Sequence, residues 1–246
     1  GGGGGGGGIG PFGENDQHIA MALASMAAMV VRNAQLQAEV HRLHLDTIFR
    51  LANAAEFRDS DTGAHIQRVS LYCETIARQL GMPTEWCQQL LFAAPMHDVG
   101  KLGVADAVLN KPGPLTDEER KIMMGHTTIG AAILKGSENE VLQMAERIAM
   151  SHHEKWDGSG YPSGLRALEI PIEGRITAVA DVYDALTSKR VYKPSMPNEK
   201  AFSIIQAGRG IHFDPQVVDA FIASREAIED IQEAYSGEQG LHPGHG

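Results

Sequence analysis

Several residue types are scarce in this chain of 246 residues, and each scarcity excludes a class of protein. Cys73 and Cys87 are its only cysteines, so a disulfide framework is excluded and a reducing compartment is favoured. Lys and Arg number 21 against 31 Asp and Glu, a formal net charge of −10. Without a basic block, no nucleic acid polymer is expected as a partner, because duplex binding depends on phosphate neutralisation. No apolar run approaches the ~20 residues of a bilayer crossing, so we expect no membrane span in this chain.

The chain is expected to have four segments. Residues 1–8 are a glycine homopolymer, which specifies no fold and is excluded from the fold analysis. Residues 9–47 are expected to form a helix and linker, residues 48–234 a folded catalytic domain, and residues 235–246 a flexible tail. From Asp16 to about Phe57 there is no Pro or Gly, which predicts one long helix.

This long helix carries a short heptad pattern of apolar positions. Its a and d positions are Met26, Met29, Asn33, Leu36, Val40, Leu43 and Thr47. Fewer than four heptads would also suit an amphipathic helix that packs on its own domain. A single Asn at an a position is a known device for fixing the register of a coiled coil. We therefore expect a dimerising stalk and a parallel homodimer, and the amphipathic helix is the alternative.

The remaining sequence shows helical periodicity in segment after segment. Apolar residues at helical spacing end at Gly81, and a capping box at Thr116 begins another helix that should continue toward Leu134. Further amphipathic segments cover residues 141–153, 174–188, 199–207 and 215–231. No stretch alternates with a period of two, so the predicted fold class is all-α.

Eleven histidines occur in a chain with few aromatic residues. His97 and Asp98 follow an apolar segment, residues 91–96, and Asp is almost never buried without a partner. The same placement, in or beside an apolar helical stripe, recurs at His65, His126, His152, His153 and Asp181. A single site that gathers these side chains from different helices explains all of them together. Imidazole and carboxylate groups suit divalent metals, so the residues alone predict a multi-metal phosphoesterase.

Two longer motifs resemble those of a known family. They are His97-Asp98-Val99-Gly100-Lys101 and the run from His152 through Glu154 and Gly158 to Tyr161-Pro162. Shorter matches lie at residues 58–65, 181–187, 190–193 and 212–215, and the resemblance covers about residues 51–222. The chain is thereby identified as similar to the HD-GYP family, a branch of the HD metal-dependent phosphohydrolases.

This resemblance implies an HD-type helical bundle and an enzyme of the bacterial cytoplasm. Such proteins are phosphodiesterases that hydrolyse cyclic di-GMP to pGpG, and often on to GMP, through a hydroxide that bridges the metals. One alternative is another metal-dependent enzyme of the HD class. A second is a catalytically weak cyclic di-GMP receptor that signals through a partner protein.

The resemblance also implies which residues bind metal. One ion is expected on His65, His97, Asp98 and Asp181, and a second on Asp98, His126, His152 and His153, with Asp98 bridging. Iron or manganese are the metals that such family sites hold. Some members bind a third ion through a Glu four residues before the first ligand His. This chain has Asp61 there, one methylene shorter, so two or three metals are expected.

The remaining candidate residues are assigned to catalysis and to the substrate. Lys101 is expected at the scissile phosphate beside the catalytic Asp98, with a solvated helix-end cation as the alternative. Tyr161, Asp184, Arg190 and Lys193 are expected to contact substrate, although Asp184 could equally bind Arg190 or a water. Residues 12–16 and 31–36 are similar to the last helix of a GAF sensory domain, which implies that the chain is the C-terminal part of a longer sensor.

Overall fold

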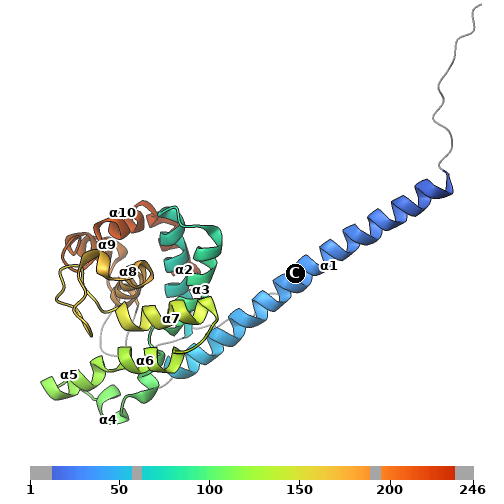
Figure 1. The fold of residues 1–246 in the computed structure, drawn as a ribbon. Helices are drawn as coiled ribbons and strands as arrows, with labels where there is room; N and C mark the ends of the chain where they lie inside the picture. Colours follow the sequence, from blue (N-terminus) through green and yellow to red (C-terminus); the bar gives the residue numbers. More distant parts are fainter. Residues whose placement is uncertain (1–12, 57–62, 189–194, 236–246) are drawn as a thin grey trace, which may run out of the picture. The chain divides into compact units, whose positions relative to one another are not determined.

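The computed structural model describes residues 13–56, 63–188 and 195–235 of the chain (Figure 1). Within these ranges the structure contains helices and one isolated β-bridge, between Arg209 and Phe213, so the predicted all-α fold is confirmed. The chain divides into two compact units, Gly1–Asp46 and Thr47–Gly246, which are described separately below.

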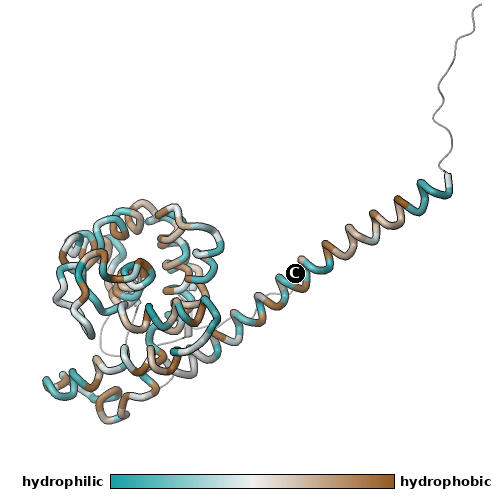
Figure 2. The backbone as a smooth tube through the Cα atoms, viewed as in Figure 1, coloured by the Kyte–Doolittle hydropathy of each residue, from teal (hydrophilic) through white to brown (hydrophobic). Residues whose placement is uncertain are grey.

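The first unit consists of most of helix α1, Glu14–Glu56, close to the long helix predicted from the sequence. Brown apolar positions recur along its tube in Figure 2, and its large apolar side chains are exposed, with Met29 at 72%. By length and composition, Glu14–Ile48 meets the requirement for a membrane-crossing helix. The sequence analysis expected no membrane span, because this segment has no unbroken apolar run. Its Ala and Met residues nevertheless raise the mean hydropathy of the helix.

The second unit is a bundle of short helices around one main core. Its principal helices are α2 (Gly63–Gln79), α3 (Thr84–Ala93), α6 (His126–Leu134), α7 (Glu140–Ser151), α8 (Ile172–Thr187) and α10 (Pro215–Ala223). Smaller elements are η1 (Ala94–Met96), η2 (Val99–Gly103), α4 (Asp106–Leu109), α5 (Asp117–Met124), η3 (Ala167–Glu169), α9 (Asn198–Ala207) and α11 (Arg225–Ala234). Helix α2 packs against α3, α8, α10 and α11, and α7 packs against α3, α6 and α8.

The predicted helix ends have the expected local chemistry. Gly81 has a φ of 76° after the end of α2, a conformation that glycine adopts at no steric cost. Thr116 accepts a hydrogen bond from the Glu119 N–H at 3.2 Å, and the Glu119 carboxylate accepts one from the Thr116 N–H, so the capping box is confirmed. Two segments predicted as single helices are divided, the first at Gly125 and the second at Ser224.

An aromatic cluster packs α2 against α8, the two helices that carry His65 and Asp181. Tyr72 of α2 contacts Tyr183 of α8 with ring centroids 5.4 Å apart, and Tyr183 contacts both Phe202 and Phe221. Each large apolar side chain stabilises the fold by roughly 1.5–3 kcal/mol when fully buried. This packing holds the faces of α2 and α8 that bear the polar groups described next.

Candidate metal centre

Seven of the eight predicted metal ligands lie together in the second unit. They form two groups, one of Asp98, His126, His152 and His153 and one of His65, His97 and Asp181. In each group, one donor atom per residue lies within 4.8 Å of all the others. The eighth predicted ligand, Asp61, lies outside the described residues.

The carboxylate of Asp98 connects the two groups. Its Oδ1 atom lies 3.2 Å from Nε2 of His126 and 3.4 Å from Nε2 of His152. Its Oδ2 atom lies 3.3 Å from Nε2 of His97, which is itself 3.9 Å from Oδ1 of Asp181. Because its two oxygens face different groups, Asp98 has the orientation that a carboxylate bridging two cations requires.

His97 and Asp98 lie at a break between helical segments. Helix α3 ends at Ala93 and is followed by the short 3₁₀ helices η1 and η2, with His97 and Asp98 between them. Pro95 lacks an N–H and its ring clashes with the preceding turn, so an α-helix cannot continue through it. The resulting turn directs both side chains into the interior, where His97 is fully buried.

Gly100 allows the neighbouring helix to approach this turn. A Cβ atom at this position would lie 1.8 Å from the carbonyl oxygen of His126 and 2.4 Å from the N atom of Gly130. Such distances are far inside van der Waals contact, so only glycine fits. The close approach of α6 to η2 brings His126, the first residue of α6, to Asp98.

Hydrogen bonds at Nδ1 orient three of the histidines so that their Nε2 lone pairs face one another. Nδ1 lies within hydrogen-bond distance of a backbone carbonyl in His97, His126 and His152, at 2.9, 2.7 and 3.0 Å. A carbonyl only accepts, so Nδ1 donates and Nε2 has no hydrogen. Nε2 of His126 and Nε2 of His152 are nevertheless only 3.4 Å apart.

This arrangement fits a bound cation. Two imidazole lone pairs and the buried Oδ1 of Asp98, which accepts no hydrogen bond, converge in one place. Without a positive charge between them these contacts are repulsive, and the burial of unpaired polar atoms is costly. A divalent ion of intermediate softness takes neutral imidazole and carboxylate ligands of this kind.

Asp98 and two of the histidines have the protonation states that metal binding needs. Burial lowers the pKa of His152 and also that of His153, so both imidazoles remain neutral near pH 7. Burial alone would raise the pKa of Asp98, but Lys101 and His97 outweigh it and hold the pKa well below its usual range. This group therefore has neutral His152 and His153 beside the ionised Asp98. Burial alone would lower the pKa of His65, but its contact with Asp184 outweighs burial and raises the pKa.

Two further predicted residues, Lys101 and Tyr161, border this cluster. Lys101, the last residue of the His97 motif, lies in η2 with its Nζ 2.8 Å from Oδ2 of Asp98. The ring of Tyr161 stacks on His153 with centroids 4.7 Å apart, and it meets the edge of His126 at 6.5 Å. Both side chains thus flank the candidate metal ligands.

Asp184 has a different position from the expected one. The prediction that it contacts substrate does not fit its environment, because its side chain is fully buried. Its Oδ2 lies 2.7 Å from His65 Nδ1, and its two oxygens accept hydrogen bonds from Nε and Nη2 of Arg68 at 2.6 and 2.8 Å. Burial alone would raise the pKa of Asp184, but these bonds hold it below its usual range. Asp184 therefore lies behind a metal ligand.

The sequence analysis gave no role to Glu154, which anchors the loop that carries Tyr161. Its buried carboxylate accepts hydrogen bonds from the backbone N–H groups of Ser163, Gly164 and Leu165, at 2.7, 3.1 and 3.0 Å. Glu154 directly follows the ligand His153, so the same few residues hold the metal site and the loop. Its place within the 152–162 motif was the sequence feature that could have identified Glu154 as a functional residue.

Arg190 and Lys193, the two predicted phosphate-binding cations, lie outside the described residues. The last described residue before them is Ser188, the C-cap of α8.

A helical bundle with imidazole and carboxylate donors in two groups around one shared aspartate has the donors that a pair of divalent metals takes. The chain belongs to the HD domain family, whose model matches residues 50–217. This membership confirms the resemblance that the His97 and His152 motifs indicated.

Known relatives are bacterial phosphodiesterases. A cyclic di-GMP phosphodiesterase of Thermotoga maritima is 46% identical over 190 residues, which cover 77% of this chain and 52% of that protein. The cyclic di-GMP phosphodiesterase response regulator RpfG of Xanthomonas campestris is 45% identical, over 78% of this chain and 51% of the relative. A 3′3′-cGAMP-specific phosphodiesterase of Vibrio cholerae is 43% identical, over 82% and 40%. The chain thus spans about half the length of these relatives or less.

Solved structures share the fold. A cyclic GMP-AMP specific phosphodiesterase of V. cholerae superposes with a TM-score of 0.54 at 19% identity, over 78% of this chain and 52% of the other. The HD domain of the phosphodiesterase PgpH of L. monocytogenes, in complex with cyclic-di-AMP, gives 0.51 at 21% identity, over 78% and 99%. The second unit therefore has the HD-domain fold.

Proposed function

We propose that this chain is a metal-dependent phosphodiesterase that hydrolyses cyclic di-GMP to pGpG and on to GMP in the bacterial cytoplasm. The observation that carries the proposal is the shared carboxylate of Asp98, whose oxygens face two separate groups of histidines. Cyclic di-GMP is the favoured substrate because relatives at 45–46% identity are named for it.

Each residue group has a distinct task in this reaction. Bound divalent ions would lower the pKa of a water and neutralise phosphate oxygens. His65, His97 and Asp181 would hold one ion, and His126, His152 and His153 the other, with Asp98 serving both. Lys101 is positioned to donate a hydrogen bond to the reacting phosphate, and Tyr161 offers a ring face for a guanine or a hydroxyl for a phosphate.

We propose iron or manganese as the metal, because a mixed imidazole and carboxylate shell suits both. A third ion would depend on Asp61. Arg190 and Lys193 would bind the substrate phosphates. They would supply positive charge, which is scarce in a chain of net charge −10.

The test is anaerobic incubation of iron- or manganese-loaded protein with cyclic di-GMP, 3′3′-cGAMP, cyclic di-AMP and mononucleotides, with products separated by chromatography. Conversion of cyclic di-GMP to pGpG and then GMP supports the proposal. Preferential cleavage of 3′3′-cGAMP would instead place the chain with its other close relatives. Binding of cyclic di-GMP without turnover by fully metal-loaded protein would identify a receptor.

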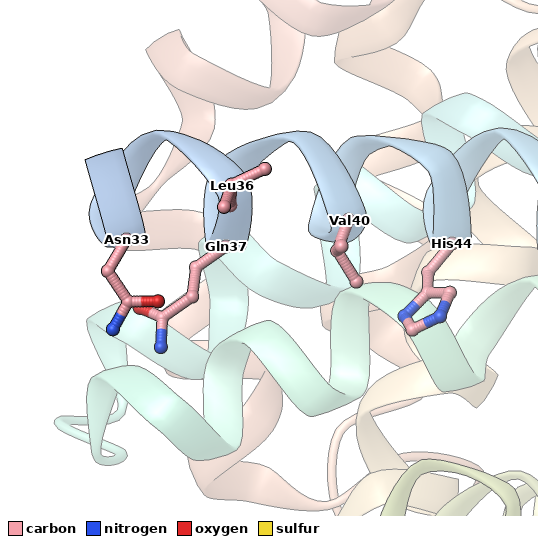
Figure 3. Close-up of a pocket in the computed structure, with 5 residues that line it drawn as sticks. All are labelled: Asn33, Leu36, Gln37, Val40 and His44. Atoms are coloured by element: carbon pink, nitrogen blue, oxygen red, sulfur yellow. The ribbon is translucent and has the colours of Figure 1, made fainter. Parts of the chain in front are cut away.

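We also propose that α1 forms a parallel homodimer. In Figure 3 the side chains of Asn33, Gln37, Val40 and His44 project from the same side of the helix, and with Leu36 they line a hollow along it. Three of these residues, Asn33, Leu36 and Val40, are the predicted a and d positions, so the hollow can receive side chains of an identical helix. The expected GAF-type sensor would precede this stalk.

A further inference from the structure

We propose that Arg68 and Asp184 are positioning residues that set the metal affinity of the His65, His97 and Asp181 group. Neither touches substrate in this proposal, and both act through the orientation of His65. The inference rests on the metal centre proposed above.

The contacts of Asp184 fix one imidazole. Nδ1 of His65 lies 2.7 Å from Oδ2 of Asp184, and an ionised carboxylate only accepts, so Nδ1 donates the hydrogen. In the neutral imidazole Nε2 then has no hydrogen, and it lies 3.8 Å from Oδ1 of Asp181. A carboxylate behind a metal-binding histidine selects the tautomer and raises the basicity of the ligand.

Arg68 in turn fixes Asp184. Its Nε and Nη2 atoms donate to the two carboxylate oxygens as a planar fork, and both side chains are at least nine-tenths buried. The remaining donors of the guanidinium reach other elements. Nη2 also donates to Ser188 Oγ at 2.7 Å, and Nη1 donates to the Tyr235 carbonyl at 3.0 Å.

The orientation of His65 therefore depends on contacts distant in sequence, unlike that of three other ligands. His97, His126 and His152 each donate to a carbonyl only three or four residues earlier in the chain. For His65 the equivalent support comes from α8 and, through Arg68, from Tyr235, the C-cap of α11. The two metal positions therefore differ in the groups that orient their ligands. A change in Asp184 should affect the metal affinity of only the His65, His97 and Asp181 group.

Asp184→Asn is the first test, because asparagine keeps the shape and one acceptor oxygen but loses the charge. Loss of a partner behind a ligand typically lowers metal affinity by about 10- to 100-fold. Manganese binding by equilibrium dialysis with elemental analysis should show one site weakened by that factor and the other unchanged. Nitrogen NMR of the metal-free protein should show His65 losing its preference for the Nδ1–H tautomer.

Asp219→Asn is the matched control. Asp219 holds Arg209 through the same two-bond fork, with both distances 2.8 Å, but on the surface. It should leave both metal affinities at the wild-type values. Arg68→Lys, compared with Arg209→Lys, should repeat the one-site effect, because an ammonium cannot form the fork.

Two results would overturn the positioning role: unchanged metal affinities in Asp184→Asn and Arg68→Lys, or equal weakening of both sites. A wild-type chain that never takes up two ions would overturn the metal centre as well. Since the measurement counts bound metal, inactivity toward cyclic di-GMP would bear on the proposed function and not on this inference.

Discussion

Asp98 presents each of its oxygens to a different set of imidazoles, so the largest effect of any single substitution is expected there. Asp98→Ala should abolish turnover and lower the metal content, because both ions lose a ligand at once. Elemental analysis and product chromatography check this. Asp230→Ala, an exposed carboxylate on α11, should retain the metal and activity of the wild type. A metal-loaded wild type that never exceeds one ion per chain would contradict the two-metal site.

Lys101 makes its ion pair with the same carboxylate, yet it is expected to act on the rate and not on metal loading. Loss of a donor to charge developing at the reacting group typically lowers kcat by ~10²–10³-fold. Lys101→Met should therefore reduce kcat by about 100-fold at unchanged metal content, with a smaller effect on KM. Lys111→Met removes a surface ion pair with Glu119 and serves as the control. A loss of metal in Lys101→Met would assign it a structural task instead.

Substitution of Asp61 tests whether the protein binds two or three metal ions. If it serves a third ion, Asp61→Ala should reduce the stoichiometry from three to two while the other sites stay filled. The measurement is elemental analysis of wild type and variant after identical reconstitution. Two ions in both proteins would leave Asp61 as a carboxylate without a ligand role.

Among the elements, α1 carries the apolar seam that most needs a partner, since Met29, Leu36 and Val40 are exposed at 72%, 50% and 49%. Leu36→Lys should convert the proposed dimer to a monomer, because it places a charge at a d position. Ala38→Lys, at the f position on the opposite face of the same turns, should not. Light scattering on chains that begin at residue 16 and at residue 48 provides the second measurement. Monomers from both chains would refute the stalk.

The elements also show what the sequence could and could not predict. The His97 motif lies within 5 consecutive residues, and the other candidate ligands lie in or beside apolar helical stripes, so a shared site could be predicted from the residues. The assignment of ligands to two ions came from the family resemblance. Arg68 was not singled out, because an Arg on an amphipathic helix is ordinarily solvated. Its partner Asp184 is 116 residues away, and only the packing of α2 on α8 brings them together. The breaks at Gly125 and Ser224 likewise depend on tertiary packing that periodicity does not encode.

For the second unit as a whole, the converging lone pairs imply that metal stabilises the fold. A ligand present at 100 times its Kd stabilises the native state by about 2.7 kcal/mol per site. In a domain of about this size, 1 kcal/mol shifts Tm by roughly 2–4 °C. Chelation should thus lower Tm by at least ~5 °C, as measured by calorimetry. The Asp98→Ala protein should melt at the same temperature with and without chelator, and equal chelator sensitivity in both would contradict this explanation.

The attachment of the Tyr161 loop through Glu154 bears on how substrate preference can diversify in this fold. Glu154 accepts hydrogen bonds from main-chain N–H groups of residues 163–165, so this anchoring places no demand on the side chains of Ser159 and Tyr161. Gly160 between them must stay a glycine, because a Cβ there would lie 2.3 Å from the Lys155 N atom. The side chains at 159 and 161 can therefore be exchanged while the Glu154 contacts and the adjoining His153 stay the same. Exchanging these two side chains for those of a 3′3′-cGAMP-specific relative would test whether the loop sets the preference between cyclic dinucleotides in the proposed activity.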